Sequence, residues 1–386
     1  MDREKFIILI LLYIAFIALG LPDQLLGVAW PTMRIDFGKN LDAAGVITFS
    51  VTMFSAFAGF INGYIAKKFP VSKILAVSVL LTAIGSLGYA LSPNWLSFLL
   101  FVIPTGLGAG SVDSSLNNYV ALNYSSRHMS WLHGFWGIGS TIGPLIMTFT
   151  FVKNLTWRGG YAIVGIILLL MSILFIVKQF GFSNRQTQDE EKSAPQSINM
   201  VTLNTFLSAT FFFFYTATEG GVGLWIYSVM TEQRGFDPVL AGTLVAIYWG
   251  SLTFGRFMVG FITKKFCDKS IILASILISL ASMLLLCIPT HTTTIIGLVV
   301  LGMGLSGIYP CTMNATHNRY EIEKAKILMG HQVGSACLGF AIMTPLLGII
   351  IQRIGLNTRH NDLFYPDFAL NRVKIEKIEC INFPKL

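Results

Sequence analysis

Apolar runs separated by short polar or basic stretches repeat along almost the whole chain. We count eleven runs, each close to the 20 residues that a helix needs to cross roughly 30 Å of hydrocarbon. The first run has no basic leader and no small-residue cleavage site, so it predicts a retained span rather than a signal peptide. The pattern predicts membrane-spanning helices near residues 6–30, 43–66, 74–91, 95–120, 129–152, 160–180, 200–230, 239–263, 270–289, 294–315 and 328–351.

One seven-residue phrase occurs twice, 197 positions apart. Residues 63–69 read GYIAKKF, and residues 260–266 read GFITKKF. The match continues upstream at the same offset, for example at Phe57 and Phe254, and each copy ends an apolar run with a pair of lysines. A repeat of half the chain length indicates two copies of one folding unit, and both copies leave the membrane on the same side.

A long polar stretch separates six predicted spans from five. It holds Ser, Gln and Pro together with the charged cluster at 189–192, which predicts a flexible cytoplasmic linker. Such a linker lets two helical bundles rock against each other around a midplane site. The predicted fold class is all-α, a polytopic membrane protein with a pair of pseudo-repeated bundles. The predicted parts are a six-helix bundle at 1–180, a linker at 181–199, a five-helix bundle at 200–351 and a polar tail at 352–386.

The repeat also makes a prediction about the end of the chain. At the offset of 197, the span at 160–180 should recur near residues 357–377, but that stretch is strongly charged and cannot cross hydrocarbon. We therefore expect a twelfth span to be missing, the tail to be a truncated or frame-shifted remnant of it, and transport to be impaired. The charged residues are Arg359, Asp362, Asp367, Arg372, Lys374, Glu376 and Lys377.

Composition and charge agree with a membrane protein. Hydrophobic residues make up 54% of the chain and charged residues 12%, about half the share found in soluble domains. The net charge of +8 follows topology rather than a nucleic-acid surface, because the loops on the side of the amino terminus hold 15 Lys and Arg and the opposite loops hold five. This asymmetry predicts a cytoplasmic amino terminus, and we expect a multi-pass protein of a bacterial plasma membrane, with the lipid bilayer as partner and no nucleic acid.

Several motifs resemble a known family. The lysine-ended phrase resembles the cytoplasmic signature of the major facilitator superfamily, although Lys67 stands where that family usually has an acidic residue and Pro70 where it usually has a glycine. The stretches GLGAGSVDSSLN at 106–117, WLHGFWG at 131–137 and YTATE at 215–219 resemble its fucose- and glucose-type sugar:cation symporter branch. The resemblance implies a secondary transporter whose gating loops contain Gly63, Lys67, Lys68, Gly260, Lys264 and Lys265.

Three carboxylates lie deep in predicted spans and are candidates for proton coupling, namely Asp23, Asp113 and Glu219. A carboxylate at a helix centre costs about 2.5–3.5 kcal/mol to insert, so each needs a partner or a function. Asp113 shares a helical stripe with Gly106, Gly110 and Asn117, where small residues allow close helix approach. The alternatives are a packing hydrogen bond for Asp113 and a fixed ion pair with Arg256 for Glu219, although we expect Arg256 to extend towards the interface instead.

A sugar site needs aromatic faces for the apolar side of the ring and amides or hydroxyls for its polar groups. Such side chains are present within the predicted spans, although any single aromatic residue can equally be a packing residue. Glu219 adjoins Gly220 and Gly221, where we expect a loosened helix. The candidate substrate-binding residues are Gln24, Asn117, His133, Trp136, Tyr215, Trp225, Tyr248, Trp249, Asn314 and Gln332.

These observations predict a secondary transporter that imports a sugar or another small polar solute together with a proton, with sodium as the second choice of ion. Span five contains GSTIGP at 139–144, which resembles part of the signature of drug:proton antiporters, so efflux of a drug or metabolite is the first alternative. A non-transporting sensor or an inactive carrier is the second. The sequence has no phosphate-binding Gly-Lys-Ser/Thr loop and no metal-ligand spacing among its five cysteines, so we expect no enzyme, no cofactor and a monomer.

Overall fold

The computed structural model describes residues 3–124, 126–177, 203–263, 265–320 and 322–357. Every regular element in these ranges is helical, which confirms the predicted all-α class. The helices are α1 (Arg3–Asp23), α2 (Leu25–Asp36), α3 (Ala44–Lys68), α4 (Val71–Leu91), α5 (Trp95–Asn123), α6 (Ser126–Val152), α7 (Thr156–Val177), α8 (Leu203–Ser228), α9 (Pro238–Ile262), α10 (Asp268–Leu286), α11 (His291–Ser306), α12 (Ile308–Arg319) and α13 (Ile322–Asn357); a short 3₁₀ turn, Leu41–Ala43, precedes α3, and a π-helical turn, Val229–Gln233, follows α8.

The helices match the predicted apolar runs. Ten spans within the described residues are long and apolar enough to cross a membrane, and α8 corresponds to the remaining run, predicted at 200–230. Two runs are broken in the middle: α1 gives way to α2 at Gln24, and α11 gives way to α12 at Gly307. Breaks of this kind occur in transporters where helix ends face a binding site.

The structure differs from the sequence expectations in α13 and in α8. Helix α13 extends to Asn357, beyond the predicted boundary at 351, and the tail beyond it lies outside the described residues, as does the predicted linker. The loosened helix expected at Gly220 and Gly221 is wrong, because α8 is continuous through both and becomes π-helical only at Val229. Both glycines instead allow close packing against α13, next to Phe340 and Leu347.

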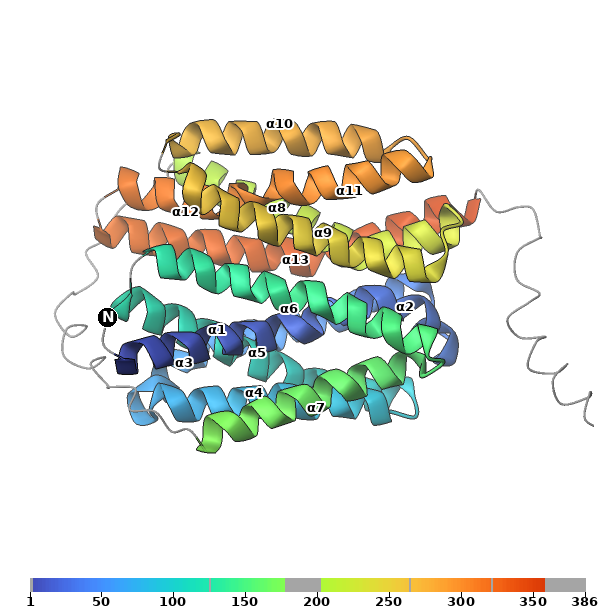
Figure 1. The fold of residues 1–386 in the computed structure, drawn as a ribbon, viewed down its shortest axis with the longest axis horizontal. Coiled ribbons are helices and arrows are strands. Elements are labelled where there is room, and N and C mark those ends of the chain that lie inside the picture. The colour runs from blue at the N-terminus through green and yellow to red at the C-terminus, as the bar shows by residue number, and fades with distance from the viewer. Residues whose placement is uncertain (1–2, 125, 178–202, 264, 321, 358–386) are drawn as a thin grey trace, which may run out of the picture.

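The helices lie roughly side by side, with α4 and α7 along one edge of the view and α10 along the other (Figure 1). Helix α1 packs on α6, α3 on α5, and α4 on both α5 and α7. In the second part of the chain α8 packs on α13, and α11 packs on α9 and α10. The two sets meet where α6 packs on α9, α13 on α3, and α2 on α8. The division into bundles at 1–180 and 200–351 stays a prediction that these contacts support.

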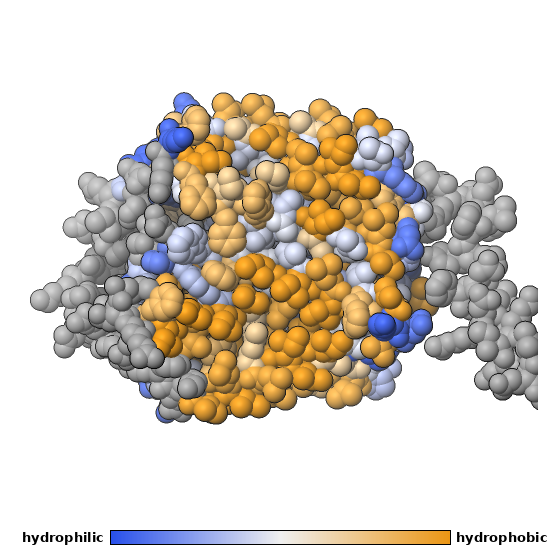
Figure 2. Space-filling model, in the orientation of Figure 1, coloured by the Kyte–Doolittle hydropathy of each residue, from blue (hydrophilic) through white to orange (hydrophobic). Residues whose placement is uncertain are grey.

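The surface shows how the molecule would sit in a bilayer. Figure 2 shows a band of hydrophobic residues around the middle, with hydrophilic residues gathered towards the two ends. Large apolar side chains such as Leu170, Leu277 and Leu284 are more than half exposed. Surface of this kind is stable only against hydrocarbon, so its position in the band supports a membrane-spanning orientation of the helices.

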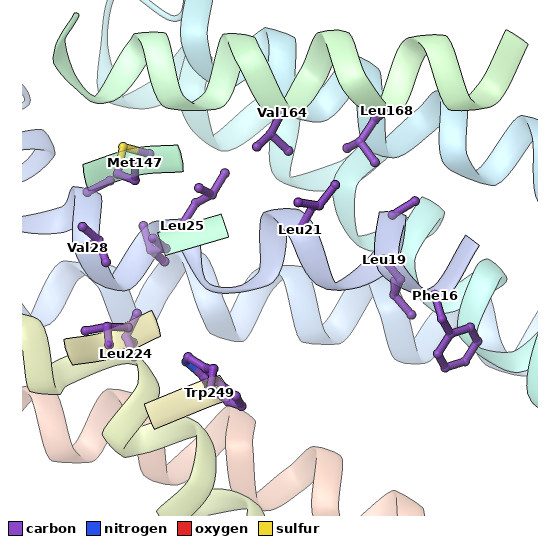
Figure 3. Packing of buried hydrophobic residues seen from close by; sticks show 14 of the residues in the cluster. Phe16, Leu19, Leu21, Leu25, Val28, Met147, Val164, Leu168, Leu224 and Trp249 are labelled. Atoms are coloured by element: carbon purple, nitrogen blue, oxygen red, sulfur yellow. The ribbon is translucent and has the colours of Figure 1, made fainter. Parts of the chain in front are cut away.

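The broken first span lies inside the protein. Leu21, Leu25 and Val28 of α1 and α2 are almost fully buried. Figure 3 shows this span between Val164 and Leu168 of α7 on one side and Leu224 and Trp249 of α8 and α9 on the other. Side chains from both sets of helices therefore pack against α1 and α2, and this packing fixes the position of the polar residues at the break.

Glycines allow α3 and α5 to approach closely. A Cβ atom on Gly106 would collide with the backbone of α3 at Val51, and one on Gly110 would collide with the backbone at Ser55. The predicted small-residue stripe is therefore a helix contact. By contrast, a Cβ on Gly59, also on α3, would meet nothing within 4 Å.

We expect Gly110→Ala to destabilise the protein and Gly59→Ala to leave it unchanged or slightly more stable. Both substitutions gain up to about 1 kcal/mol of helix propensity, but only the first forces two helices apart, which typically costs about 1–3 kcal/mol. The measurement is the thermal unfolding midpoint of each purified variant in the same detergent. Equal midpoints for the two variants would contradict the close contact between α3 and α5.

Candidate functional site

A buried ion pair joins α8 and α9. Arg256 Nη2 lies 2.7 Å from Glu219 Oε1, and both side chains are about nine-tenths buried, with exposures of 10% and 9%. The same guanidinium nitrogen donates to the Tyr215 hydroxyl at 3.4 Å. The expectation that Arg256 extends to the membrane interface is therefore wrong: α8 presents a carboxylate close to it, and pairing satisfies a charge that hydrocarbon would not.

A second carboxylate, Asp23, lies at the break between α1 and α2. The indole nitrogen of Trp136 on α6 donates to Asp23 Oδ2 at 2.8 Å. The ring of Trp136 in turn lies 5.6 Å from the Arg256 guanidinium and meets the ring of Trp249 edge to face at 5.6 Å. One indole therefore touches both the Asp23 carboxylate and the Arg256 cation, and it links the first set of helices to the second.

The third carboxylate, Asp113 on α5, is exposed and accepts a hydrogen bond from Asn117 Nδ2 at 2.9 Å. The predicted contact between these residues, one turn apart, is confirmed. Asp113 is close enough to Asp23, Tyr309 and Cys337 to interact with each electrostatically. Asp113 therefore faces the interior between the two sets of helices, where its exposure indicates access to water rather than to lipid.

Aromatic rings surround these charges. Tyr309 on α12 lies 6.0 Å from both Tyr215 and His133, measured between ring centroids. The hydroxyl of Tyr248 donates to the backbone oxygen of Glu219 at 3.1 Å, which fixes α8 against α9. We call Asp23, Asp113, Trp136, Glu219 and Arg256, together with the rings of Tyr215, His133 and Tyr309, the central polar cluster.

Two further predicted residues lie beside the cluster. The Trp249 ring and the Gln24 side-chain oxygen both lie against Gly223 of α8. A Cβ atom at this glycine would collide with them. The indole nitrogen of Trp249 is buried and has no hydrogen-bond partner among the described residues. An orphaned buried donor costs about 1–3 kcal/mol, so the position favours a ligand or a water molecule that accepts from it.

Other predicted substrate residues make contacts elsewhere. The indole nitrogen of Trp225 donates to the backbone oxygen of Thr344 at 2.8 Å in the contact between α8 and α13. Asn314 donates to Asp268 at 2.8 Å, where α12 meets the start of α10. Gln332 is fully buried and donates to Ser208 and Thr316. The structure does not bring these three residues to the central polar cluster.

The predicted gating residues lie at one end of the bundle. Lys68, at the end of α3, and Lys265, just after α9, are exposed, and Gly260 near the end of α9 is exposed too. Lys73, Lys269 and Arg319 are also at this end, which we call the basic end. Gly63 and Lys67 lie in α3, but their side chains are outside the described residues, and so is Lys264.

The two sets of helices touch at the end opposite to the basic end. Arg34 Nη2 lies 2.9 Å from Glu232 Oε2, which joins α2 to the π-helical turn after α8. The backbone nitrogen of Asp42 donates to Gln352 Oε1 at 3.0 Å, which joins the 3₁₀ turn before α3 to the end of α13. A Cβ on Gly45 would collide with Pro345 at the same place.

Glycines of α3 and α13 differ between the two ends of the bundle. A Cβ on Gly59 of α3 or on Gly334 of α13 would meet nothing within 4 Å, whereas near the opposite end their backbones are in contact. Cys337 and His331 of α13 are exposed along this part. The described contacts between the two sets of helices thus lie at the end opposite to the basic end, while these positions of α3 and α13 are open.

The sequence did not single out three residues that take part in these contacts. Arg256 was expected at the interface, and neither Cys337, beside Asp113, nor Glu232, between two predicted runs, was a candidate. A charged residue two turns inside an apolar run was the available signal for Arg256. No signal existed for Glu232, because its partner is 198 positions away in the chain.

The sequence is similar to those of known transport proteins. The sequence model of the Major Facilitator Superfamily matches residues 12–342. The glucose/mannose transporter GlcP of Bacillus subtilis strain 168 is 22% identical over 365 residues, covering 87% of this chain and 86% of GlcP. A TsgA homolog of Buchnera aphidicola is 24% identical over 321 residues, covering 79% of this chain and 81% of that protein.

Solved structures share the fold. A bacterial homolog of the human lysosomal transporter Spinster, in an inward-facing and occupied conformation, superposes with a TM-score of 0.72 at 13% identity, covering 93% of this chain and 86% of that chain. A D-xylose–proton symporter superposes with a TM-score of 0.70 at 12% identity, covering 91% and 97%. At these identities the likeness is one of architecture.

Proposed function

Because this chain belongs to the major facilitator superfamily, we propose that it imports a sugar or another small polar solute together with a proton, by alternating access. The observation that carries the proposal is the central polar cluster, in which Trp136 contacts both Asp23 and Arg256. Carboxylates, a paired cation and aromatic faces meet there at the junction of the two sets of helices. Transporters built from repeats place their sites at such a junction.

The proposed solute would lie among residues of both sets of helices. Trp136 and Tyr309 offer aromatic faces to the apolar side of a sugar ring, and Gln24 and Asn117 offer amides to its hydroxyls. The unpaired indole nitrogen of Trp249 adds a donor that a sugar oxygen would satisfy. Sugar transport by relatives such as GlcP supports this choice of solute class.

The proposed coupling residues are Asp113, Glu219 and Asp23. The ion pair with Arg256 ties Glu219 to the protein, whereas Asp113 and Asp23 are exposed to the interior and lie within electrostatic reach of each other. Two neighbouring carboxylates share a proton more readily than either binds one alone. We therefore propose that Asp113 and Asp23 carry the coupled proton. The ion pair of Glu219 and Arg256 would change its contacts when that proton binds or leaves.

The charge asymmetry of the loops supports a cytoplasmic basic end. In that orientation the contact between Arg34 and Glu232 faces outward, which supports the proposal that this is a state open to the cytoplasm. Release of solute from this state and reopening of the outer contact would complete the cycle. The coupling of one charge to a potential of 100 mV would supply about 2.3 kcal/mol, enough for about fortyfold accumulation.

The test is a panel of solutes in proteoliposomes with simultaneous readout of internal pH. The expected result is acidification of the lumen together with uptake of a sugar or polyol, driven by an imposed pH gradient. Transport of lipophilic cations with sugars ignored would instead favour drug efflux. Solute binding without counterflow would favour a sensor or an inactive carrier, and either result would overturn the proposal.

The contact between Arg34 and Glu232 gives a further prediction about the cycle. We expect Arg34→Gln to shift the equilibrium towards the state open at this end by up to about fivefold, since partly exposed ion pairs contribute at most about 1 kcal/mol. The measurement is the distance between spin labels on the exposed residues Lys39 and Gln233 in nanodiscs. The charge-exchanged double variant R34E/E232R should restore the original distance distribution, and its failure to do so would contradict a direct ionic contact.

A further inference from the structure

A cavity of about 450 Å³ lies at the basic end, apart from the central polar cluster. It is bounded by α8, α10, α12 and α13, and none of the cluster residues lines it.

The lining changes from charged to apolar with depth. Lys269 and Arg319, at the start of α10 and the end of α12, are exposed and form no ion pair with another described residue. Along α10 the wall continues with Ile272 and ends at Ile276, which lies seven residues, or about 10 Å, beyond Lys269. The cavity thus has two cations at its basic end and an apolar wall about 10 Å further along α10.

A buried amide supports the polar side of this cavity. Gln332 Nε2 donates to Ser208 Oγ at 2.6 Å and to Thr316 Oγ1 at 2.8 Å, and both of these residues line the cavity. Gln332 is 0% exposed, and its carbonyl oxygen has no partner among the described residues. Through these bonds α8, α12 and α13 are held together around the cavity, so its shape is fixed by the fold rather than by chance surface packing.

The cavity opens sideways towards lipid. Only 22% of the α10 span is buried, compared with 67% of the α4 span, which α7 covers. Leu273, a lining residue, is 56% exposed, and Leu277 one turn further is 57% exposed. An acyl chain of the bilayer can therefore reach the cavity without passing through the protein.

We propose that this cavity binds an anionic phospholipid from the leaflet at the basic end. The phosphate would lie between Lys269 and Arg319, and one acyl chain would lie along Ile272, Leu273 and Ile276. Charge complementarity at the mouth and the apolar floor together favour this occupant over a soluble anion, which would leave the floor unfilled, and over a neutral lipid, which would leave two cations unpaired. Helices α8 and α12 also carry Glu219 and Tyr309, so a bound lipid would contact the same helices that position the central polar cluster.

The first experiment measures lipid retained by the whole protein. Protein released from nanodiscs of phosphatidylcholine with increasing phosphatidylglycerol is analysed by native mass spectrometry. We expect one phosphatidylglycerol to be retained, with an apparent affinity about fivefold weaker for Lys269→Gln, about fivefold weaker for Arg319→Gln and about 25-fold weaker for the double variant. Lys73→Gln, an exposed lysine at the same end on α4, is the matched control and should retain lipid as the original protein does.

A second variant separates a built site from general attraction to a charged membrane. Ile276→Trp fills the floor and keeps both cations, so it should abolish retention while the thermal midpoint in pure phosphatidylcholine stays unchanged. Retention by Ile276→Trp, or a loss in Lys73→Gln equal to that in Lys269→Gln, would overturn the proposal. Retention of soluble glycerol phosphate with the same affinity as the lipid would indicate a free phosphate site and would also overturn it. A dimer that Ile276→Trp abolishes would do the same, because it would indicate a second copy of the chain on this face.

Discussion

Replacement of Arg256 with methionine is expected to abolish solute transport and to lower the free energy of unfolding by about 3–5 kcal/mol. The side chain of Arg256 is 10% exposed and that of its partner Glu219 is 9% exposed, so removal of the guanidinium leaves a carboxylate buried without its cation. The substitution also removes the cation from the face of Trp136 and a hydrogen bond to Tyr215. Three side chains of the central polar cluster, those of Glu219, Trp136 and Tyr215, therefore lose a partner at once.

The double variant E219Q/R256M provides the control for this prediction. It removes both charges, so it should recover most of the stability lost in Arg256→Met, while transport stays absent if the pair takes part in the cycle. The measurements are the thermal unfolding midpoint and solute counterflow in proteoliposomes. A double variant as unstable as Arg256→Met would contradict the cost of an unpaired Glu219 carboxylate. Normal transport by Arg256→Met would contradict a role of the ion pair in the transport cycle.

Asp113→Asn is expected to separate solute movement from proton movement. An asparagine keeps the shape of the side chain and its contact with Asn117, but it cannot bind and release a proton. Energised accumulation should fall from about fortyfold at 100 mV to about onefold, while solute counterflow remains. The measurement is uptake under an imposed pH gradient, with internal pH recorded in the same vesicles.

Two comparisons make the Asp113 prediction specific. Asp42→Asn, at the end opposite to the basic end, changes a carboxylate outside the central polar cluster and should leave coupling intact. Asp23→Asn keeps an acceptor oxygen for the Trp136 indole and tests the neighbouring carboxylate. Loss of coupling in Asp23→Asn alone, with Asp113→Asn unaffected, would move the proton from Asp113 to Asp23.

The contact between Asp113 and Asn117 could be predicted because it lies within one helix. Residues four positions apart face the same side of a helix whatever surrounds it, so their spacing was sufficient. The close approach at Gly106 and Gly110 was predictable for the same reason. Contacts between helices are different, because the sequence places a residue on a helix face but does not say which helix that face meets.

Gln332 and Asn314 show the effect of this limit. Both are amides within apolar runs, and the chemistry of either side chain suits a sugar site. In the structure Gln332 joins α8, α12 and α13, while Asn314 contacts Asp268 at the end of the bundle. For Arg256 the sequence left two possibilities, the interface and an ion pair with Glu219, and the structure places the Glu219 carboxylate 2.7 Å from it.

The sequence by itself determined the number and approximate positions of the spans, the repeat, the family resemblance and the basic end of the bundle. These properties depend on local hydrophobicity and on loop charge, which a bilayer selects segment by segment. Only the tertiary structure decided that Arg256 meets Glu219, that Trp136 bridges to Asp23, and that the bundle is closed at Arg34 and Glu232. Helices that are apolar on all sides carry little signal for their rotation in lipid, so close packing and the pairing of buried polar groups decide which faces meet.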